Sequence, residues 1–361
     1  MRSTESSKHI GQAVEQLLRG ELVALPTETV YGLGADASND AAIAKIFAAK
    51  GRPAEHPLIV HVAKNSDLRK WAIDIPPIAK KLTDAFWPGP LTLILKKSAR
   101  IPLSVTGGQC TVGLRCPAHP LAQKLLHEFA KVGSGIIAAP SANKFGHVSP
   151  TTAQHVRDEF GDALLILDGG ACKVGIESTI VDLSRMKTLK RPVVLRPGAI
   201  TPEMIRKVIG EMPLQPDDLP VAKSAAPAAQ PRVSGSLAAH YAPMTPLKLL
   251  SGDALQIEMD AQLTAGNRIA VLAFAAMPRV KPSPVGVGVR NARRLVWISA
   301  EADPISYAQS LYANLRTLDA AQTNLILVEA PPASPAWHAV NDRLGRAATG
   351  SGMREGKQLP S

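Results

Sequence analysis

The stretch from Leu25 to Val62, LPTETVYGLGADASNDAAIAKIFAAKGRPAEHPLIVHV, contains the signals from which the first part of the fold can be worked out. The residues before it, from Glu21 to Leu25, are mostly apolar and stop at Pro26, which is typical of a strand ended by proline. Polar side chains follow Pro26 in a turn that we expect Gly32 and Gly34 to close. The stretch therefore opens as a strand and a polar turn.

A helix and a second strand complete the stretch. Asn39 can cap the helix, apolar residues recur at helical spacing from Ile43, and Gly51 can end it. The apolar run Pro57–Val62 then predicts a strand that contains His61. Alternation of strands and helices continues along the chain, which predicts an α/β fold.

Lys50 and Arg52 flank Gly51 at the end of the predicted helix. Cations are favoured near a helix C-terminus by the helix dipole, which is one interpretation of this pair. The other is a phosphate clamp, because lysine supplies a point charge and arginine a planar fork. Neither a G-x-x-x-x-G-K-[ST] loop nor a G-x-G-x-x-G turn opens a helix here, so the familiar nucleotide-binding motifs are absent.

Composition restricts the class of protein. A chain of 361 residues with 45% apolar residues is expected to form two or three globular domains. No run approaches the roughly 18 apolar residues of a membrane span, and the N-terminus lacks the apolar core of a signal peptide. The three cysteines have no metal-ligand spacing and suit reduced thiols. We therefore expect a cytoplasmic protein with no membrane partner and no metal site of its own.

A net charge of +11 favours anionic partners, either nucleotides or nucleic acid. Lysine and arginine are scattered rather than grouped, and aromatic residues make up only 4% of the chain. Both features weaken the hypothesis of an extensive nucleic-acid surface.

The chain divides at Pro213, where a proline-rich segment begins. We predict a first domain over 1–212, an interdomain linker or lid over 213–246, a smaller α/β domain over 247–350 and a disordered tail over 351–361. Polar clusters follow apolar runs only in the first domain, which is where loops of α/β sheets bind ligands. The second domain is interpreted as regulatory or structural.

Six motifs follow one another along the chain: PTETVYGLG from Pro26, KGRP from Lys50, HPL from His56, PSAN from Pro140, SPT from Ser149 and ESTIVD from Glu177. In their type and order they resemble those of a known family, the threonylcarbamoyl-adenylate synthases, in their long two-domain form. HYAP from His240 also resembles that form. The resemblance covers nearly all of residues 10–350.

The resemblance implies a YrdC-like α/β domain with a twisted sheet and a large, positively charged cavity, followed by a smaller Rossmann-like α/β domain. It also implies an enzyme that makes threonylcarbamoyl-AMP and pyrophosphate from L-threonine, bicarbonate and ATP. A separate complex would then transfer the threonylcarbamoyl group to tRNA.

Two groups of residues follow from the same resemblance. Lys50 and Arg52 would be catalytic, since they would neutralise the phosphates, and Arg115 would hold the threonine carboxylate as a fork. His56 departs from the asparagine that is commoner in the family. The L-threonine site would comprise Thr29, His61, Arg115, Ala139 and Ser178. The ATP site would comprise Lys50, Arg52, His56, Thr111, Ser141, Asn143, Ser149, Arg196 and Ser234.

For the mechanism we expect positioning rather than a covalent nucleophile. A neutral threonine amine would capture carbon dioxide or activated bicarbonate, the carbamate would attack the α-phosphorus of ATP, and Mg²⁺ would be held mainly through the phosphates. Asp168, Glu177 and Asp182 are all candidate general bases, and the sequence does not choose among them.

Two other classes compete with this interpretation. One is an RNA-binding YrdC-like module, with at least weak tRNA binding suggested by the positive charge. The other is a carbamoyl-transfer maturation factor that shares the YrdC-like domain. Such factors also have zinc-finger cysteine pairs, and three scattered cysteines argue against that class.

Overall fold

The computed structural model describes residues 2–219, 230–276 and 294–352. They group into two compact units, of which the first lies within Met1–Phe145 and Ser149–Ser236, and the second within Gly146–Val148 and Leu237–Ser361. The linker proposed for 213–246 is thus divided after Ser236. Its residues 220–229 lie outside the described residues, as does the tail from 353.

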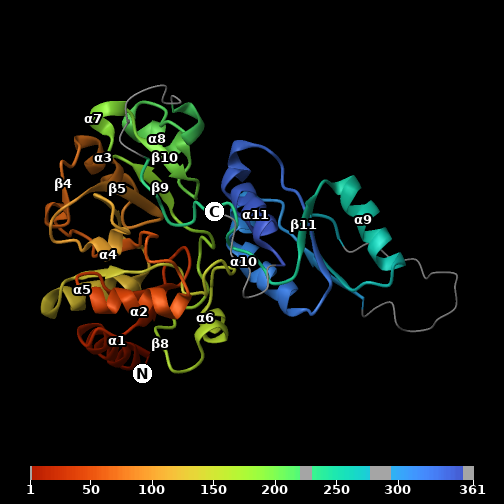
Figure 1. The fold of residues 1–361 in the computed structure, drawn as a ribbon, viewed down its shortest axis with the longest axis horizontal. Coiled ribbons are helices and arrows are strands. Elements are labelled where there is room, and N and C mark those ends of the chain that lie inside the picture. Colours follow the sequence, from red (N-terminus) through yellow and green to blue (C-terminus); the bar gives the residue numbers. More distant parts are fainter. Residues whose placement is uncertain (1, 220–229, 277–293, 353–361) are drawn as a thin grey trace. The chain divides into compact units, whose positions relative to one another are not determined.

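The first unit is built on a mixed sheet of ten strands among the described residues (Figure 1). The strand order is β10-β9-β5-β6-β3-β7-β2-β1-β8, and β4 pairs with β5. The strands are β1 (Val23–Leu25), β2 (Gly32–Asp36), β3 (Ile59–Val62), β4 (Ala72–Ile73), β5 (Leu91–Lys97), β6 (Thr111–Arg115), β7 (Ile136–Ala138), β8 (Leu165–Ile166), β9 (Thr179–Asp182) and β10 (Val193–Arg196).

Helices cover both faces of this sheet, as alternation of the buried residues along β7 shows. Ile137 packs with residues of α1 and α5, whereas its neighbours Ile136 and Ala138 belong to the core that α2 and α3 help to build. The helices of this unit are α1 (Arg2–Leu18), α2 (Asp40–Lys50), α3 (Pro77–Phe86), α4 (Leu103–Thr106), α5 (Pro120–Val132), α6 (Ala153–Phe160), α7 (Met186–Leu189) and α8 (Pro202–Ile209), with short 3₁₀ turns η1 (Leu68–Lys70) and η2 (Pro216–Asp218).

The predicted helix after Asn39 is present as α2, and both of its ends form as expected. The Asn39 side chain accepts hydrogen bonds from the backbone N–H groups of Ala41 and Ala42. Gly51 takes the left-handed conformation, with φ 62°, at the C-terminus. Capping therefore sets the ends of the helix that delivers Lys50.

The prediction that Gly32 and Gly34 close a turn is wrong. Both lie in β2, a strand that pairs with β1 and β7. A Cβ atom at Gly34 would come within 2.8 Å of the Leu25 side chain and 2.9 Å of the Ile137 side chain. The glycine is required by close packing in the middle of the sheet rather than by a turn.

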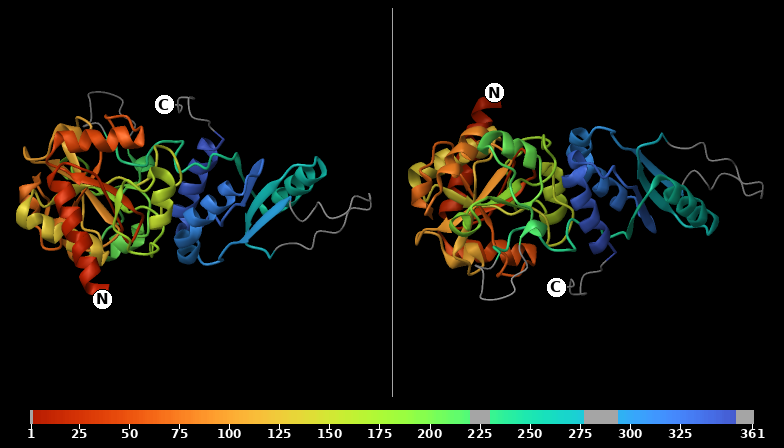
Figure 2. Two further views of the ribbon diagram at one scale, coloured as in Figure 1. Left: turned by 90° about the horizontal axis from the view of Figure 1, so that it is seen from below. Right: turned by 90° about the horizontal axis from the view of Figure 1, so that it is seen from above.

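The second unit is a smaller α/β domain with a parallel sheet in the order β11-β14-β12-β13. Figures 1 and 2 show α9 on one face of this sheet and α10 with α11 on the other. The expected pair of α/β domains is thus confirmed. The elements are β11 (Leu247–Leu250), α9 (Gly252–Thr264), β12 (Ile269–Ala273), β13 (Leu295–Ser299), α10 (Pro304–Ala320), β14 (Leu325–Glu329), η4 (Pro335–Trp337) and α11 (His338–Gly350).

The HYAP segment belongs to the second unit and is packed into it. The Tyr241 ring stacks on Tyr312 at 5.6 Å between centroids, and the guanidinium of the buried Arg343 lies 5.3 Å from the Tyr241 ring centroid. The His240 N–H donates to the Arg346 carbonyl.

None of the helices in the described ranges combines the length and the apolar character that a membrane span requires.

Candidate active site

Three neighbouring strands of the first unit place polar side chains side by side in the interior. Arg115 of β6 is paired in register with His61 of β3 and with Thr92 of β5. Residues directly opposite each other in a sheet point to the same face, so these three side chains form a row. All three are buried.

Ser178 extends the row. It immediately precedes β9, the other neighbour of β5, and its hydroxyl lies 2.7 Å from the Thr92 hydroxyl. Three of the five residues predicted for L-threonine, namely His61, Arg115 and Ser178, are therefore brought together by adjacent strands. Thr92 joins them although sequence reasoning did not single it out.

The turn between β1 and β2 contributes the next two groups. The Thr27 hydroxyl donates to the Val30 carbonyl at 2.6 Å and accepts from the backbone N–H groups of Thr29 and Val30. This is the local bonding typical of a threonine turn, and it fixes Glu28 and the fully buried Thr29.

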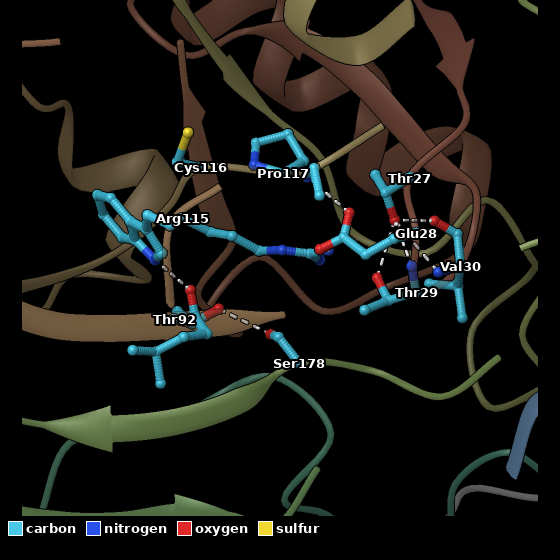
Figure 3. A network of polar contacts seen from close by, with 12 residues as sticks. Thr27, Glu28, Thr29, Val30, Thr92, Arg115, Cys116, Pro117 and Ser178 are labelled. Atoms are coloured by element: carbon cyan, nitrogen blue, oxygen red, sulfur yellow. Dashed lines mark hydrogen bonds and ion pairs between the residues drawn. The ribbon is translucent and has the colours of Figure 1, made fainter. Parts of the chain in front are cut away.

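Glu28 and Arg115 form a buried ion pair (Figure 3). One Glu28 oxygen, Oε1, accepts from Arg115 Nη2 at 2.7 Å, and the other, Oε2, accepts from the Ala118 backbone N–H at 2.8 Å. Figure 3 shows the two charged groups meeting tip to tip, with Thr29 and Ser178 both below the ion pair in this view. Glu28 lies inside the PTET motif, but its partner is 87 positions away, so sequence reasoning missed this contact.

One nitrogen of the row, Arg115 Nε, is buried without a hydrogen-bond partner among the described residues. Burial, followed by the charge of Arg115, lowers the pKa of His61 to about 3, so the imidazole is neutral at pH 7. Unpaired buried polar atoms are rare in folded proteins and usually need a ligand or water. Ala139, the remaining predicted threonine residue, is buried, and its N–H donates to the Ile59 carbonyl at 3.1 Å.

Lys50, the last residue of α2, contacts the turn formed by residues 140–143. Lys50 Nζ donates to the backbone carbonyls of Ser141 at 2.6 Å and Asn143 at 2.5 Å. Burial, followed by the nearby charge of Arg52, holds the Lys50 pKa well below its usual value. Lys50 therefore shapes the turn that presents Ser141 and Asn143.

Phe145 brings together two of the predicted ATP residues. The Arg52 guanidinium lies 6.0 Å from the Phe145 ring centroid, and the His56 ring centroid lies 5.4 Å from it. Arg52 also donates to the Pro57 carbonyl at 2.9 Å and lies 3.5 Å from the Ser234 hydroxyl. Burial, followed by the charge of Arg52, lowers the pKa of His56.

Arg196 connects the two predicted groups of residues. Its Nε and Nη2 donate to the Ser178 carbonyl at 3.0 and 2.9 Å, Nη2 also reaches the Ser178 hydroxyl, and Nη1 donates to the Ser234 carbonyl at 2.8 Å. Ser178 was predicted for threonine and Ser234 for ATP. One guanidinium thus contacts a residue of each predicted group.

A pocket lies beside this junction. Its lining includes Thr111 and Ser234, both predicted for ATP, and the apolar side chains of Ile59, Ile94 and Ile180. Its lining thus combines apolar side chains with a few polar groups.

The three candidate bases differ in their surroundings. Asp182 is paired with Arg185 at 2.6 Å, and Asp168 is exposed and accepts from the Gly170 N–H. Glu177 and Asp182 are both buried, but Glu177 differs in its contact: it accepts from the hydroxyl of Ser149, a predicted ATP residue, at 2.7 Å. The contacts favour Glu177 over the other two as a participant in the site. No group of three or more His, Cys, Asp or Glu side chains in the described ranges could hold a metal by itself.

Two family models match the chain. The first, described as "Telomere recombination", matches residues 15–198, and the second, described as "Threonylcarbamoyl-AMP synthase, C-terminal domain", matches residues 200–349. Together the two models cover both units.

Curated relatives and a crystal structure agree with these models. A threonylcarbamoyl-AMP synthase of Pyrococcus abyssi is 39% identical over 91% of this chain and 90% of its own length, and one of Bacillus subtilis is 39% identical over 96% and 94%. The crystal structure of P. abyssi Sua5 complexed with L-threonine superposes with a TM-score of 0.77 at 36% identity, covering 94% of each chain.

Proposed function

The chain belongs to the threonylcarbamoyl-AMP synthase family, and from this premise we propose how its residues divide the work of the reaction. The activity is that of a threonylcarbamoyl-AMP synthase, a transferase that uses ATP. The substrates we propose are L-threonine, bicarbonate and ATP, and the products are threonylcarbamoyl-AMP and pyrophosphate. The observation that supports a single composite site best is the bonding of Arg196 to both Ser178 and Ser234.

L-threonine would occupy the space in front of the row His61, Arg115, Thr92. Arg115 Nε would donate to its carboxylate, in a charge-assisted bond that removes one unpaired buried group. Thr29, Ser178 and neutral His61 would supply partners for the hydroxyl and amine, and Ala139 would limit the size of the pocket. The structure of P. abyssi Sua5 complexed with L-threonine supports L-threonine as a substrate.

ATP would lie between the pocket and the 140–143 turn. Ile59, Ile94 and Ile180 offer apolar walls for the base, with Thr111 and Ser234 as polar contacts. Arg52 and His56, with Ser141, Asn143, Ser149 and Arg196, would surround the phosphates and ribose. In this arrangement the carbamate formed on the threonine nitrogen and the α-phosphorus would meet near Ser178 and Arg196.

The reaction needs few groups beyond these. Threonine would lose one ammonium proton to solvent, and the neutral amine would add to carbon dioxide formed from bicarbonate by loss of water. The adduct would lose a second proton to give the carbamate, whose oxygen would then displace pyrophosphate from the α-phosphorus. Arg52 would stabilise the charge that accumulates on pyrophosphate, and Lys50 would hold the turn that positions the nucleotide. We assign no covalent intermediate with the protein.

Mg²⁺ would be held mainly by the ATP phosphates. The Glu177 carboxylate and the Ser149 hydroxyl are hard oxygen donors 2.7 Å apart next to the proposed phosphate site, and such donors suit this ion. When bound, Mg²⁺ would supply neutralisation of phosphate charge.

The product has one chemically reasonable fate, transfer of its activated threonylcarbamoyl group to an acceptor. We propose that a separate complex delivers it to tRNA in the cytoplasm. The net charge of +11 would support weak contact with tRNA.

The decisive experiment is detection of the product by mass spectrometry. Purified protein is incubated with ATP, bicarbonate and L-threonine, with L-valine replacing L-threonine in a parallel reaction. We expect threonylcarbamoyl-AMP to form with threonine and very little product with valine, because a pocket built to bond a hydroxyl is left with unpaired groups by valine. Absence of product with threonine would refute the proposal, and equal yields would refute the hydroxyl contacts.

A further inference from the structure

We propose that Glu28 is a specificity-determining residue that selects zwitterionic amino acids, by facing the α-ammonium group of the substrate while Arg115 binds the carboxylate. This inference rests on the proposed function, since it requires that the amino acid bind at Arg115. It adds a residue to which the family resemblance assigned no role.

The contacts of Glu28 leave it able to accept a further hydrogen bond. Each carboxylate oxygen has one partner, Arg115 Nη2 or the Ala118 N–H. A carboxylate offers about four acceptor sites, so capacity remains on both oxygens. On the Arg115 side, Nε is buried and has no partner among the described residues, so its donor capacity is unused.

The covalent structure of an α-amino acid then brings the ammonium group toward Glu28. The ammonium and carboxylate groups are bonded to the same carbon atom. A carboxylate bound at Arg115 therefore places the ammonium within reach of whatever surrounds the guanidinium. Glu28 is the acidic side chain that is in contact with that guanidinium (Figure 3).

The charge of the pocket leads to the same conclusion. Arg115 and Glu28 are nearly buried, with side-chain exposures of 5% and 10%, and their charges cancel. His61 adds no charge at pH 7, because burial lowers its pKa to about 3. Beside this pair, a carboxylate without an ammonium would place a second anion next to the Glu28 carboxylate, whereas a zwitterion brings its own cation to Glu28. With Glu28 neutral, the pocket would instead carry a positive charge and favour anions.

The test compares two ligands that differ only by the amino group, L-threonine and (R)-3-hydroxybutanoate, by calorimetry with the full chain. The variant is Glu28→Gln, which keeps the shape, removes the charge, and leaves one carbonyl oxygen that can accept from Arg115 or from Ala118 but not from both donors at their two positions. Loss of one charge-assisted contact corresponds to roughly a tenfold to hundredfold change in affinity. We expect Glu28→Gln to weaken threonine binding by at least about tenfold while hydroxybutanoate binding stays equal or strengthens.

Asp182→Asn is the matched control, since Asp182 is also a buried acid paired with an arginine, Arg185 at 2.6 Å. We expect it to leave the ratio of the two affinities unchanged. The proposal would be overturned if Glu28→Gln left the ratio of the two affinities as in the wild type. If both affinities fell equally, Glu28 would only hold Arg115 in place.

Wild-type protein provides an independent measurement if Glu28→Gln does not fold. It should prefer threonine to hydroxybutanoate by at least about tenfold, and equal affinities would overturn the inference about Glu28 while leaving the proposed function intact. If the wild type bound no threonine at all, the proposed function would fail together with the inference.

Discussion

Single residues of the site have properties that their positions in the chain do not reveal. His61 is an ordinary strand residue in the sequence, yet it is buried beside Arg115 and its pKa falls to about 3. Its protonation therefore connects the site to folding. An unfolded chain binds a proton at this histidine below pH 6.5, whereas the folded chain does not until about pH 3.

This difference predicts a pH dependence of stability. The free energy of unfolding should fall as the pH decreases from 6.5 toward 3, with His61 accounting for about 2 kcal/mol at pH 5. His61→Gln should remove that part of the slope, and His127→Gln, at an exposed position, should not. The measurement is urea denaturation at several pH values. Equal slopes for wild type and His61→Gln would show that the histidine is not buried as a neutral group.

Arg52 is the residue for which a catalytic and a structural role make opposite predictions. If it stabilises departing pyrophosphate, Arg52→Ala should lower kcat/KM about a hundredfold or more, corresponding to about 2–4 kcal/mol. The lost bond to the Pro57 carbonyl should cost only about 1 kcal/mol of stability. Arg69→Ala, at a highly exposed arginine, is the control. A protein that melts early but keeps its specific activity would instead support the helix-end interpretation.

At the scale of elements, the segment from Glu177 to β9 is positioned by the loop after β10. A Cβ atom at Gly198 would lie 2.5 Å from the Thr179 nitrogen and 2.8 Å from the Glu177 carbonyl oxygen. These two residues flank Ser178, which contacts both Thr92 and Arg196. The glycine therefore allows the loop to approach the backbone that carries the site.

Gly198→Ala should consequently disturb both stability and substrate binding. Overpacking of this kind costs about 1–3 kcal/mol, and we expect the KM for threonine to rise as Ser178 moves. Gly11→Ala is a suitable comparison, because nothing lies within 4 Å of its added Cβ and alanine is favoured in a helix. Denaturation curves and steady-state kinetics on both variants test this. Unchanged values for Gly198→Ala would mean that the loop can shift without cost.

At the scale of the whole molecule, the linker proposed for 213–246 contributes to both units. In the first unit, Arg232 donates to the Gly107 carbonyl at 2.7 Å and Val233 joins a core cluster with Ile94 and Ile180. Ser234 meets Arg196 and lines the pocket. The later residues His240 and Tyr241 are packed in the second unit. Such an arrangement suits the proposed lid, whose far end the second unit would anchor.

Two truncated chains separate a lid from a simple tether. A chain ending at Gly210 loses residues 230–236 and should lose most synthesis while remaining folded, because the lid would exclude water from a labile carbamate and mixed anhydride. A chain ending at Ser236 keeps the contacts with Arg196 and Gly107, and should retain more activity than the shorter one. Rates of threonylcarbamoyl-AMP formation provide the comparison. Full activity of the shorter chain would show that the linker is only a tether.

The sequence by itself determined the α/β class, the two α/β domains and the family, because these depend on local periodicity, caps and ordered motifs. It correctly predicted α2 with both caps. It did not predict α9, whose apolar residues include Ile257, 72% exposed, and so do not form one buried stripe.

Only the tertiary structure decided which residues meet. About 90 positions of sequence separate Glu28 from Arg115, and likewise Lys50 from the Ser141 and Asn143 carbonyls. These groups come into contact only when the strands pair. Gly32 and Gly34 of β2 are a second example. In the sequence they are typical of a turn, whereas in the structure β2 pairs with β1 and β7, and a Cβ atom at Gly34 would clash with side chains of both strands. Local patterns specify elements, whereas burial, shared charge and close packing depend on contacts between distant segments, which no local pattern contains.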